Sequence, residues 1–159
     1  MAALPPALRL GLLSDTHGLL RPQALEALRG CELILHAGDI GAPEILDQLK
    51  GIAPVIAVRG NVDTQRWCYE LPSTEIVELP AASIYVLHNL SELGLNPAAS
   101  GFHIVLSGHT HKQEARWKDN VLYINPGSAG PRRFSLPITL ATLDLSQKPW
   151  SPRFIELGP

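Results

Sequence analysis

Residues 8–38, LRLGLLSDTHGLLRPQALEALRGCELILHAG, decide the fold because two apolar runs enclose a segment with helical periodicity. The apolar runs 8–14 and 32–38 have the length of buried strands. Between them, segment 21–30 carries its apolar residues on one helical face and ends in a glycine. This order predicts two parallel strands joined by a right-handed helical crossover.

The same alternation continues for another 22 residues. Segment 42–51 has Pro43 near its start and Gly51 at its end, as expected of a helix. The apolar run 54–60 then supplies a third strand. The first part of the chain therefore predicts a β-α-β-α-β unit.

The second part of the chain is rich in strands. Only segment 91–99 is a plausible helix there, and Asp119-Asn120 is a hairpin signal. The strand-like segments are 74–79, 83–88, 102–108, 113–118, 121–125 and 138–145. We therefore expect a single α/β domain over 1–159, with two mixed sheets packed face to face and helices outside.

Composition excludes several classes of protein. The net charge of −2 and the lack of a basic stripe count against a nucleic-acid partner. The N-terminus does not have the pattern of a signal peptide, and no apolar stretch reaches membrane-spanning length. Cys31 and Cys68 fit no CxxC pattern and are expected to be reduced thiols. We expect a cytoplasmic protein, and the sequence does not decide between a monomer and a homo-oligomer.

Five of the expected strands end in residues that can bind metals. The carboxyl ends of strands in an open α/β sheet meet at one crevice, so these side chains should lie close together. They are Asp15 and His17 after the first strand, Asp39, Asn61 and His88 after three others, and His109 and His111 after 102–108.

Carboxylate, amide and imidazole groups together suit Mn²⁺, Fe or Zn²⁺ better than Ca²⁺ or Mg²⁺ alone. Seven groups are too many for one catalytic ion, but they suit two ions about 3.5–4 Å apart that activate a bridging water and hold a phosphoryl group. His109 and His111 can then point to neighbouring ions. Taken singly, Asp15 could cap a helix and Asn61 could form a turn. The coincidence at five strand ends favours the metal site.

The remaining histidines and the tryptophans are assigned to packing. His36 lies inside its strand and His103 at the start of another, so both are expected in the core or behind the metal ligands. Trp67, Trp117 and Trp150 are too scattered to form a stacking platform and are expected to pack in the core or an interface.

The motifs at the strand ends, taken in order, resemble those of the calcineurin-like metallophosphoesterases, and most closely the compact bacterial and archaeal phosphodiesterases. The motif series D-x-H, GD, GN, H and GHxH is met by SDTHG (14–18), AGD (37–39), GNVD (60–63), His88 and SGHTHK (107–112), and NPGSAGPR (125–132) resembles the closing element. The resemblance covers nearly the whole chain. It implies a four-layer α/β/β/α sandwich.

The resemblance also implies a ligand set for two divalent ions. One ion would be held by Asp15, His17, Asp39 and His111, and the other by Asp39, Asn61, His88 and His109, so that Asp39 bridges them. Mn²⁺ is the favoured ion, with Fe, Ni²⁺, Zn²⁺ and Mg²⁺ as alternatives. The expected reaction is hydrolysis of a small phosphodiester by a metal-bridging hydroxide, with Asp39 and Asn61 as the catalytic residues and Asn61 stabilising charge on the phosphoryl oxygens.

Two departures from the family pattern keep an alternative open. Val62 stands where larger members have a histidine that protonates the leaving group, and Asn89 and Leu90 replace a Gly-His pair that relatives usually have after the ligand histidine. The alternative is a scaffold of the same fold, catalytically weak or inactive, that binds other proteins, as one eukaryotic retromer subunit of similar fold does. Arg132 and Arg133 are either phosphate contacts or solvated surface residues.

Overall fold

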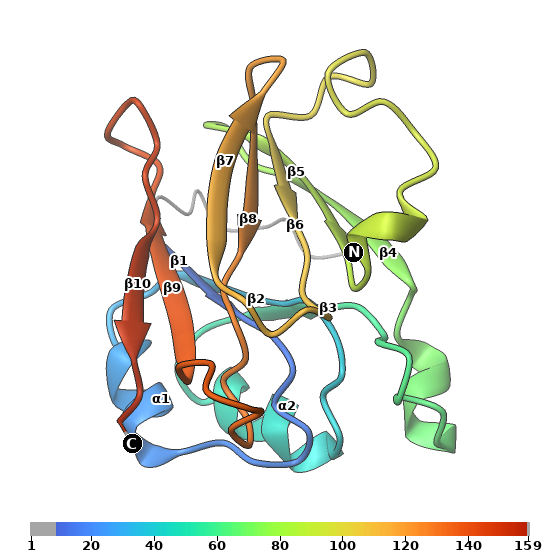
Figure 1. Ribbon diagram of the computed structural model, residues 1–159, viewed down its shortest axis with the longest axis vertical. Coiled ribbons are helices and arrows are strands. Elements are labelled where there is room, and N and C mark those ends of the chain that lie inside the picture. Colours follow the sequence, from blue (N-terminus) through green and yellow to red (C-terminus); the bar gives the residue numbers. More distant parts are fainter. Residues whose placement is uncertain (1–8, 159) are drawn as a thin grey trace.

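Two five-stranded mixed sheets form the centre of the molecule in a computed structural model that describes residues 9–158 (Figure 1). The first sheet has the order β10-β9-β1-β2-β3, in which β1 and β3 are parallel to β2, and β9 is antiparallel to β1. Its strands are β1 (Arg9–Leu13), β2 (Leu33–His36), β3 (Val55–Ala57), β9 (Thr139–Asp144) and β10 (Arg153–Glu156). The predicted β-α-β-α-β unit is thus confirmed.

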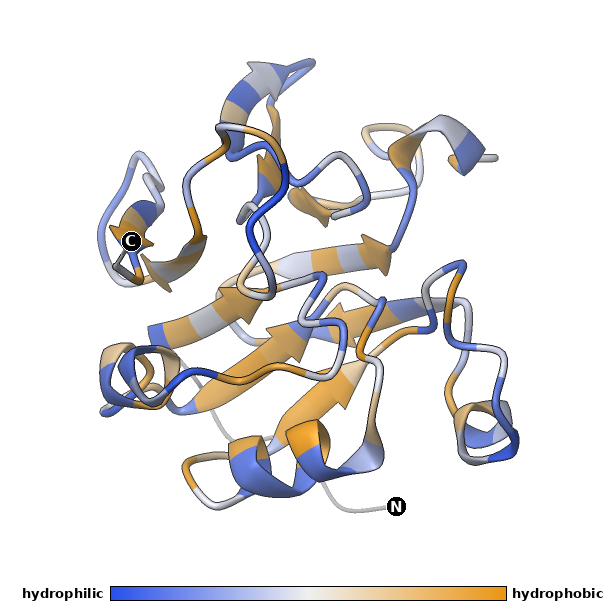
Figure 2. Cartoon of the chain, turned by 60° about the horizontal axis from the view of Figure 1, so that its bottom comes forward, coloured by the Kyte–Doolittle hydropathy of each residue, from blue (hydrophilic) through white to orange (hydrophobic). Residues whose placement is uncertain are grey.

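Helices α1 (Pro22–Ala27) and α2 (Pro43–Lys50) cover the outer face of the first sheet (Figure 1). Each begins with a proline in its first turn, where the missing N–H costs nothing. Both faces of this sheet are covered, so its central strands are hydrophobic nearly throughout (Figure 2). This explains why the sequence shows continuous apolar runs there.

The second sheet has the order β4-β5-β6-β8-β7. Its strands are β4 (Thr74–Glu78), β5 (Ser83–Leu87), β6 (Ile104–Leu106), β7 (Glu114–Lys118) and β8 (Val121–Asn125). The centre of the sheet, β5-β6-β8, is parallel, and the two edge strands are antiparallel. Asp119 and Asn120 join β7 to β8 with φ of 52° and 63°, so the predicted hairpin is confirmed.

The two sheets pack face to face and enclose the larger hydrophobic core. Leu12 and Leu35 of the first sheet and Val86 and Leu106 of the second belong to this one cluster of buried side chains. Because alternate residues of a strand point to opposite faces, the same strands of the second sheet place Tyr85, among others, on its outer face. The α/β class and the face-to-face arrangement of two mixed sheets are confirmed.

The structure differs from the expected elements at three places. Segment 91–99 is not a helix, since only η2 (Leu90–Glu92) forms a 3₁₀ turn there and Gly94 and Pro97 disfavour continuation. The segment that packs on the outer face of the second sheet through Leu90 and Leu93 therefore consists of turns rather than a regular helix. Strand β10 and the 3₁₀ helix η1 (Arg66–Glu70) were not expected, because both are too short to show a period in the sequence.

His103 is not in the core, and that prediction was wrong. Its ring is exposed, packs edge-on against the Trp150 ring and accepts a hydrogen bond from the Ser83 N–H through Nδ1. His36 is fully buried, as predicted, and Cys31 and Cys68 are buried free thiols. Trp150 packs in the core, Trp67 is partly buried against the helical side, and Trp117 is half exposed. No helix among residues 9–158 is long and apolar enough to cross a membrane.

Candidate metal centre

The predicted ligands meet where the ends of the two sheets face each other. Asp15, His17, Asp39 and Asn61 follow strands of the first sheet, and His88, His109 and His111 follow strands of the second. Backbone hydrogen bonds hold the loops side by side, since Asp15 N–H donates to Gly38 O and Gly108 N–H donates to His88 O, both at 2.9 Å. The seven residues are therefore brought to one place from positions nearly a hundred residues apart.

Asp15 lies at the bottom of the centre and is completely buried. Its Oδ2 accepts hydrogen bonds from Ser14 Oγ at 2.7 Å and from the His109 N–H at 3.0 Å. Its Oδ1 accepts none, but three imidazole Nε2 atoms surround it, those of His111 at 3.3 Å, His17 at 3.7 Å and His88 at 3.8 Å. Burial alone would raise the pKa of Asp15, but the nearby imidazoles of His111 and His17 and the hydrogen bond from Ser14 outweigh it and hold that pKa far below its usual range.

Asp39 lies between histidines from both halves of the centre. Its Oδ2 is 3.2 Å from His88 Nε2 and 3.6 Å from His17 Nε2, while its Oδ1 accepts a hydrogen bond from the Val62 N–H at 3.0 Å. Burial opposes ionisation of Asp39, yet the nearby His88 imidazole and the hydrogen bond from the Val62 N–H lower its pKa. The carboxylate is thus held ionised, with one oxygen directed to the histidines.

His88 presents a fixed ring nitrogen to the two carboxylates. Its Nδ1–H must donate to Ala37 O at 2.7 Å, because a carbonyl oxygen can only accept, and this leaves Nε2 directed at Asp39 and Asp15. A hydrogen bond of this kind orients a ligand histidine and selects its tautomer. Without a metal, burial lowers the pKa of His88, but the neighbouring Asp39 and Asp15 more than reverse this effect and raise it.

The backbone of the ligand residues is strained in a consistent way. Asp15, His17, Asp39, His109 and His111 all have positive φ, between 46° and 74°. Residues with a Cβ rarely take this left-handed conformation, and such strain clusters at functional sites. Five of the seven predicted ligands share this conformation, as expected if their strand ends form a functional site.

The donor atoms fit a divalent cation. Within the described residues, the buried side-chain nitrogen and oxygen atoms that lack a hydrogen-bond partner are Asp15 Oδ1, His17 Nε2, His88 Nε2 and His111 Nδ1. Burying such atoms unpaired is costly, and a cation would satisfy them together. Two groups have ligand atoms within 4.8 Å of one another, Asp15-His17-His111 and Asp15-Asp39-His88. Asp15 belongs to both groups, whereas Asp39 was expected to be the one residue that binds both ions.

Asn61 and His109 lie at the exposed rim of the centre. Their side chains are 3.3 Å apart, from Asn61 Oδ1 to His109 Nδ1, and the His109 ring centre is 5.3 Å from that of His88. They are therefore near the second group but more open to solvent. Arg132 and Arg133 are exposed, and the Arg132 guanidinium donates to Leu136 O at 3.2 Å, so nothing in the structure directs these arginines at the ligands.

Asp63 supports the loops of the centre, a role that was not expected from the sequence. Its buried carboxylate accepts hydrogen bonds from the N–H groups of Ile40 at 3.0 Å, Gly41 at 3.2 Å and Gly60 at 2.9 Å. It thereby ties the loop after β2, which carries Asp39, to the loop after β3. The residue stands inside the quoted GNVD motif, so its position was visible, but its contacts depend on the fold.

Asn125 and His36 support other loops in the same way. Asn125 Nδ2 donates to Gly108 O and Thr110 Oγ1, both at 3.0 Å, and so fixes the loop that carries His109 and His111. His36 Nδ1 accepts from the Gly38 N–H at 3.1 Å, and its Nε2 lies 3.0 Å from Thr16 Oγ1. Burial lowers the pKa of His36 to about 4, so the ring is neutral.

The chain matches the calcineurin-like phosphoesterase superfamily domain over residues 8–148, and it belongs to that family. A probable metallophosphoesterase of Methanothermobacter thermautotrophicus is 35% identical over 143 residues, which are 80% of this chain and 81% of the relative. An archaeal phosphodiesterase of known structure is 25% identical with a TM-score of 0.78, and the match covers 92% of this chain and 99% of that one. Vps29 of Chaetomium thermophilum shares the fold at 15% identity with a TM-score of 0.76, over 94% of this chain and 96% of that one.

Proposed function

We propose that this protein is a two-metal phosphodiesterase, formed by the whole chain as one domain. The observation that carries the proposal is the group of buried, unpartnered ligand atoms around the Asp15 and Asp39 carboxylates. Membership of a phosphoesterase family and the likeness to an archaeal phosphodiesterase support the same reaction class. The proposed ligands are Asp15, His17, Asp39, Asn61, His88, His109 and His111, and Mn²⁺ is the favoured ion.

The residues of the centre would divide the work of hydrolysis. Bound divalent ions supply an activated water and neutralise charge on the phosphoryl oxygens. Asp39, with one oxygen held by the Val62 N–H, fixes the separation of the two halves of the centre. Asn61 lies at the exposed rim, where its side-chain amide can donate a hydrogen bond to a phosphoryl oxygen. Buried Asp15 holds the loop of the histidines in place through the His109 N–H.

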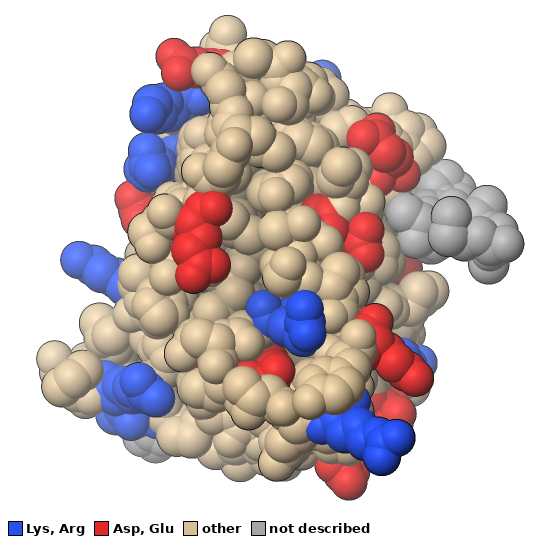
Figure 3. Space-filling model, turned by 90° about the vertical axis from the view of Figure 1, so that its right-hand side faces the viewer, with Lys and Arg blue, Asp and Glu red and all other residues tan. Residues whose placement is uncertain are grey.

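The surface beside the centre suits a small substrate better than a nucleic acid. On the side of the molecule that carries β4 and the two 3₁₀ helices, Lys and Arg are scattered between Asp and Glu and form no continuous stripe (Figure 3). A nucleic-acid-binding face would instead gather basic residues into a stripe along the backbone of its ligand. We therefore propose a small phosphodiester as the substrate.

The decisive experiment compares metal content and activity of two variants. Protein purified without chelator is loaded with Mn²⁺, and hydrolysis of bis(4-nitrophenyl) phosphate is measured beside metal stoichiometry. Asp39→Asn should lose activity and metal at both sites, whereas His88→Ala should deplete mainly one site. Asp47→Asn, on the exposed face of α2, serves as the matched control. Two ions retained by Asp39→Asn would refute the bridging role of Asp39.

A scaffold function remains the second candidate because Vps29 has the same fold. A scaffold has no need of the complete ligand set that this chain carries. The same experiment separates the two candidates. Wild-type protein that binds no Mn²⁺ and hydrolyses no diester would favour the scaffold.

A further inference from the structure

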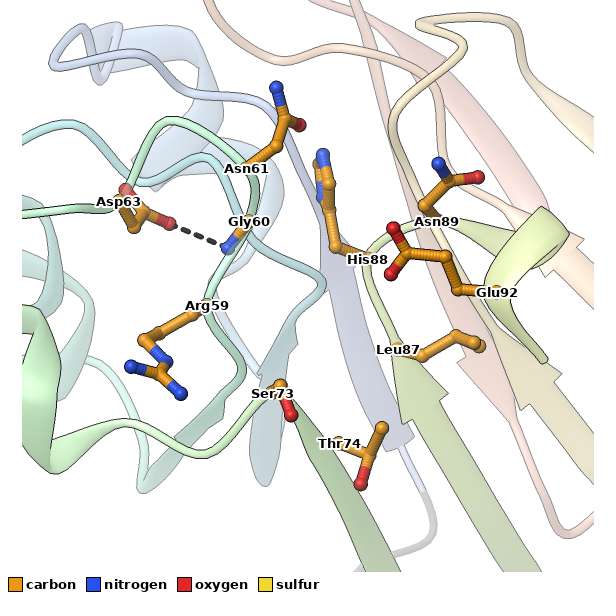
Figure 4. Close-up of a pocket in the computed structure, with 10 residues that line it drawn as sticks. All are labelled: Arg59, Gly60, Asn61, Asp63, Ser73, Thr74, Leu87, His88, Asn89 and Glu92. Atoms are coloured by element: carbon orange, nitrogen blue, oxygen red, sulfur yellow. Dashed lines mark hydrogen bonds between the residues drawn. The ribbon is translucent and has the colours of Figure 1, made fainter. Parts of the chain in front are cut away.

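A cavity of about 440 Å³ opens directly beside the metal centre (Figure 4). Asn61 and His88, two of the proposed ligands, form part of its wall, so the cavity and the centre are continuous. The volume lies in the range of small-molecule sites, roughly 300–1,000 Å³. A phosphoryl group held at the centre would therefore have room for one of its alcohol groups in this cavity.

Polar side chains dominate the walls of the cavity. Arg59 stands on the side of the loop after β3, Glu92 stands on the opposite side, and Ser73 and Thr74 lie at the start of β4 (Figure 4). Within residues 9–158, neither the Arg59 guanidinium nor the Glu92 carboxylate has a hydrogen-bond or ion-pair partner from the protein. Both charged groups are therefore available to a ligand.

The altered segment after His88 builds the Glu92 wall. Asn89 Oδ1 accepts hydrogen bonds from the Ser91 N–H at 3.1 Å and from Ser91 Oγ at 2.8 Å, and so caps η2. This turn brings Glu92 to the cavity (Figure 4). At Asn89 and Leu90 the chain departs from the family pattern. In place of the usual Gly-His pair it forms a capped turn, and this turn carries the Glu92 carboxylate.

We infer that this cavity binds a hydroxyl-rich alcohol group of the substrate, a polyol or sugar, which Arg59 and Glu92 recognise from opposite sides. The inference rests on the proposed phosphodiesterase function and adds the chemical class of the substrate. Hydroxyl groups both donate and accept hydrogen bonds, so one polyol can donate to Glu92 and accept from Arg59. The hydroxyls of Ser73 and Thr74 add further partners at the start of β4.

Other kinds of alcohol fit the walls less well. Among the described residues that line the cavity there is no Phe, Tyr or Trp, and the His88 ring is turned to the Asp15 and Asp39 carboxylates, so a nucleobase or an aryl group would find no large ring to stack on. The apolar side chain in the lining is Leu87, which offers little to an alkyl chain. A second anionic group would be attracted by Arg59 but repelled by Glu92.

Inhibition by two phosphate monoesters tests the inference. Glycerol 1-phosphate and propyl phosphate have the same charge and chain length, but only the glycerol ester carries two free hydroxyl groups. Their binding to Mn²⁺-loaded protein is measured by calorimetry and by inhibition of bis(4-nitrophenyl) phosphate hydrolysis. Wild-type protein should prefer the glycerol ester by roughly 10-fold, as expected for hydrogen bonds to charged groups. Glu92→Ala and Arg59→Gln should each remove most of that preference. The exposed residues of η1 provide matched controls, Glu70→Ala and Arg66→Gln, which should keep it.

The outcomes separate this inference from the proposed function. Affinity for inorganic phosphate should stay the same in all four variants, since the phosphoryl site is intact in each. If phosphate binds and the diester is hydrolysed but both esters bind equally well to wild-type protein, the polyol inference is wrong and the phosphodiesterase stands. If phosphate does not bind and no diester is hydrolysed, the proposed function itself fails. A preference that persists in both Glu92→Ala and Arg59→Gln also overturns the inference.

Discussion

Val62 gives the proposed reaction a dependence on the leaving group. Its side chain is apolar and 45% exposed, and its backbone N–H donates to Asp39 Oδ1. A positioned general acid contributes roughly 10²–10⁴-fold by protonating the leaving oxygen. Without one at this position, the rate should fall steeply as the pKa of the leaving alcohol rises. A plot of log kcat against that pKa checks this where chemistry limits turnover, and a flat line would show that another residue supplies the proton.

Asp63 should matter for metal affinity although it is not a proposed ligand. Asp63→Asn replaces one oxygen by an NH₂ group that cannot accept, so part of the clamp on the Ile40, Gly41 and Gly60 N–H groups is lost. We expect weaker Mn²⁺ binding and a loss of about 1–3 kcal/mol in the free energy of unfolding. Metal titration and urea unfolding measure the two effects, with Asp47→Asn as the exposed control. Unchanged stability would contradict the clamp.

His36 should make the metal-free protein sensitive to mild acid. Burial lowers its pKa from 6.5 to about 4, so between these values the unfolded chain binds a proton that the folded chain does not. The free energy of unfolding therefore falls as the pH decreases from 6.5 to 4, by roughly 3 kcal/mol for this residue. Asp15 and Asp39 have lowered pKa values and lose their contribution only at lower pH.

The pH effect of His36 is measured as a difference between two proteins. Urea unfolding of chelator-treated wild type and of His36→Gln is measured at pH 6.5 and 4.5. The raised pKa of His88 changes stability in the opposite direction, but His88 is present in both proteins, so the difference between them isolates the effect of His36. His36→Gln should be less stable at pH 6.5 and should lose less stability on acidification. Equal slopes would show that His36 does not stay neutral.

At the scale of elements, the succession of strands and helices in the first part of the chain and the polar residues at the strand ends were predictable, but the residues that support the proposed ligands were not. Apolar runs and Asp, Asn or His at their ends can be read directly from 8–61, because parallel strands bury both faces and share one edge. Asp63, by contrast, connects its own loop to the N–H groups of Ile40 and Gly41, more than 20 residues away, so no local pattern reveals this contact. Segment 91–99 was misread since a capped turn can have the composition of a short helix.

Gly60 allows the loops after β2 and β3 to approach each other closely at the centre. A Cβ at this position would lie 2.3 Å from Asp39 N and 2.7 Å from Asp39 Cγ, because the loops after β2 and β3 touch there. Gly60→Ala should push Asp39 aside, weaken Mn²⁺ binding and cost about 1–3 kcal/mol in stability. Gly94→Ala is the matched control, since its Cβ would meet nothing within 4 Å. Mn²⁺ titration of the two variants should therefore differ, and similar affinities would argue against close contact of the two loops.

At the scale of the whole molecule, the proposed metal ligands come from both sheets. Asp15 and Asp39 follow strands of the first sheet, while His88 and His111 follow strands of the second. Bound ions would therefore join the two sheets at one end, as the apolar core joins them in between. Metal-free protein keeps that core, so it should stay folded but become less stable.

The size of the metal effect follows from binding. A ligand that binds only the folded state stabilises it by about 2.7 kcal/mol when its concentration is 100 times Kd, so two sites would add roughly 5 kcal/mol. Thermal unfolding with Mn²⁺ and with chelator should show this difference in wild type and much less of it in Asp39→Asn. Hydrogen exchange should slow at the ends of both β2 and β5 when Mn²⁺ is added, because the ions hold both sheets. Protection confined to one sheet would mean that the ligands of the other sheet do not bind the metal.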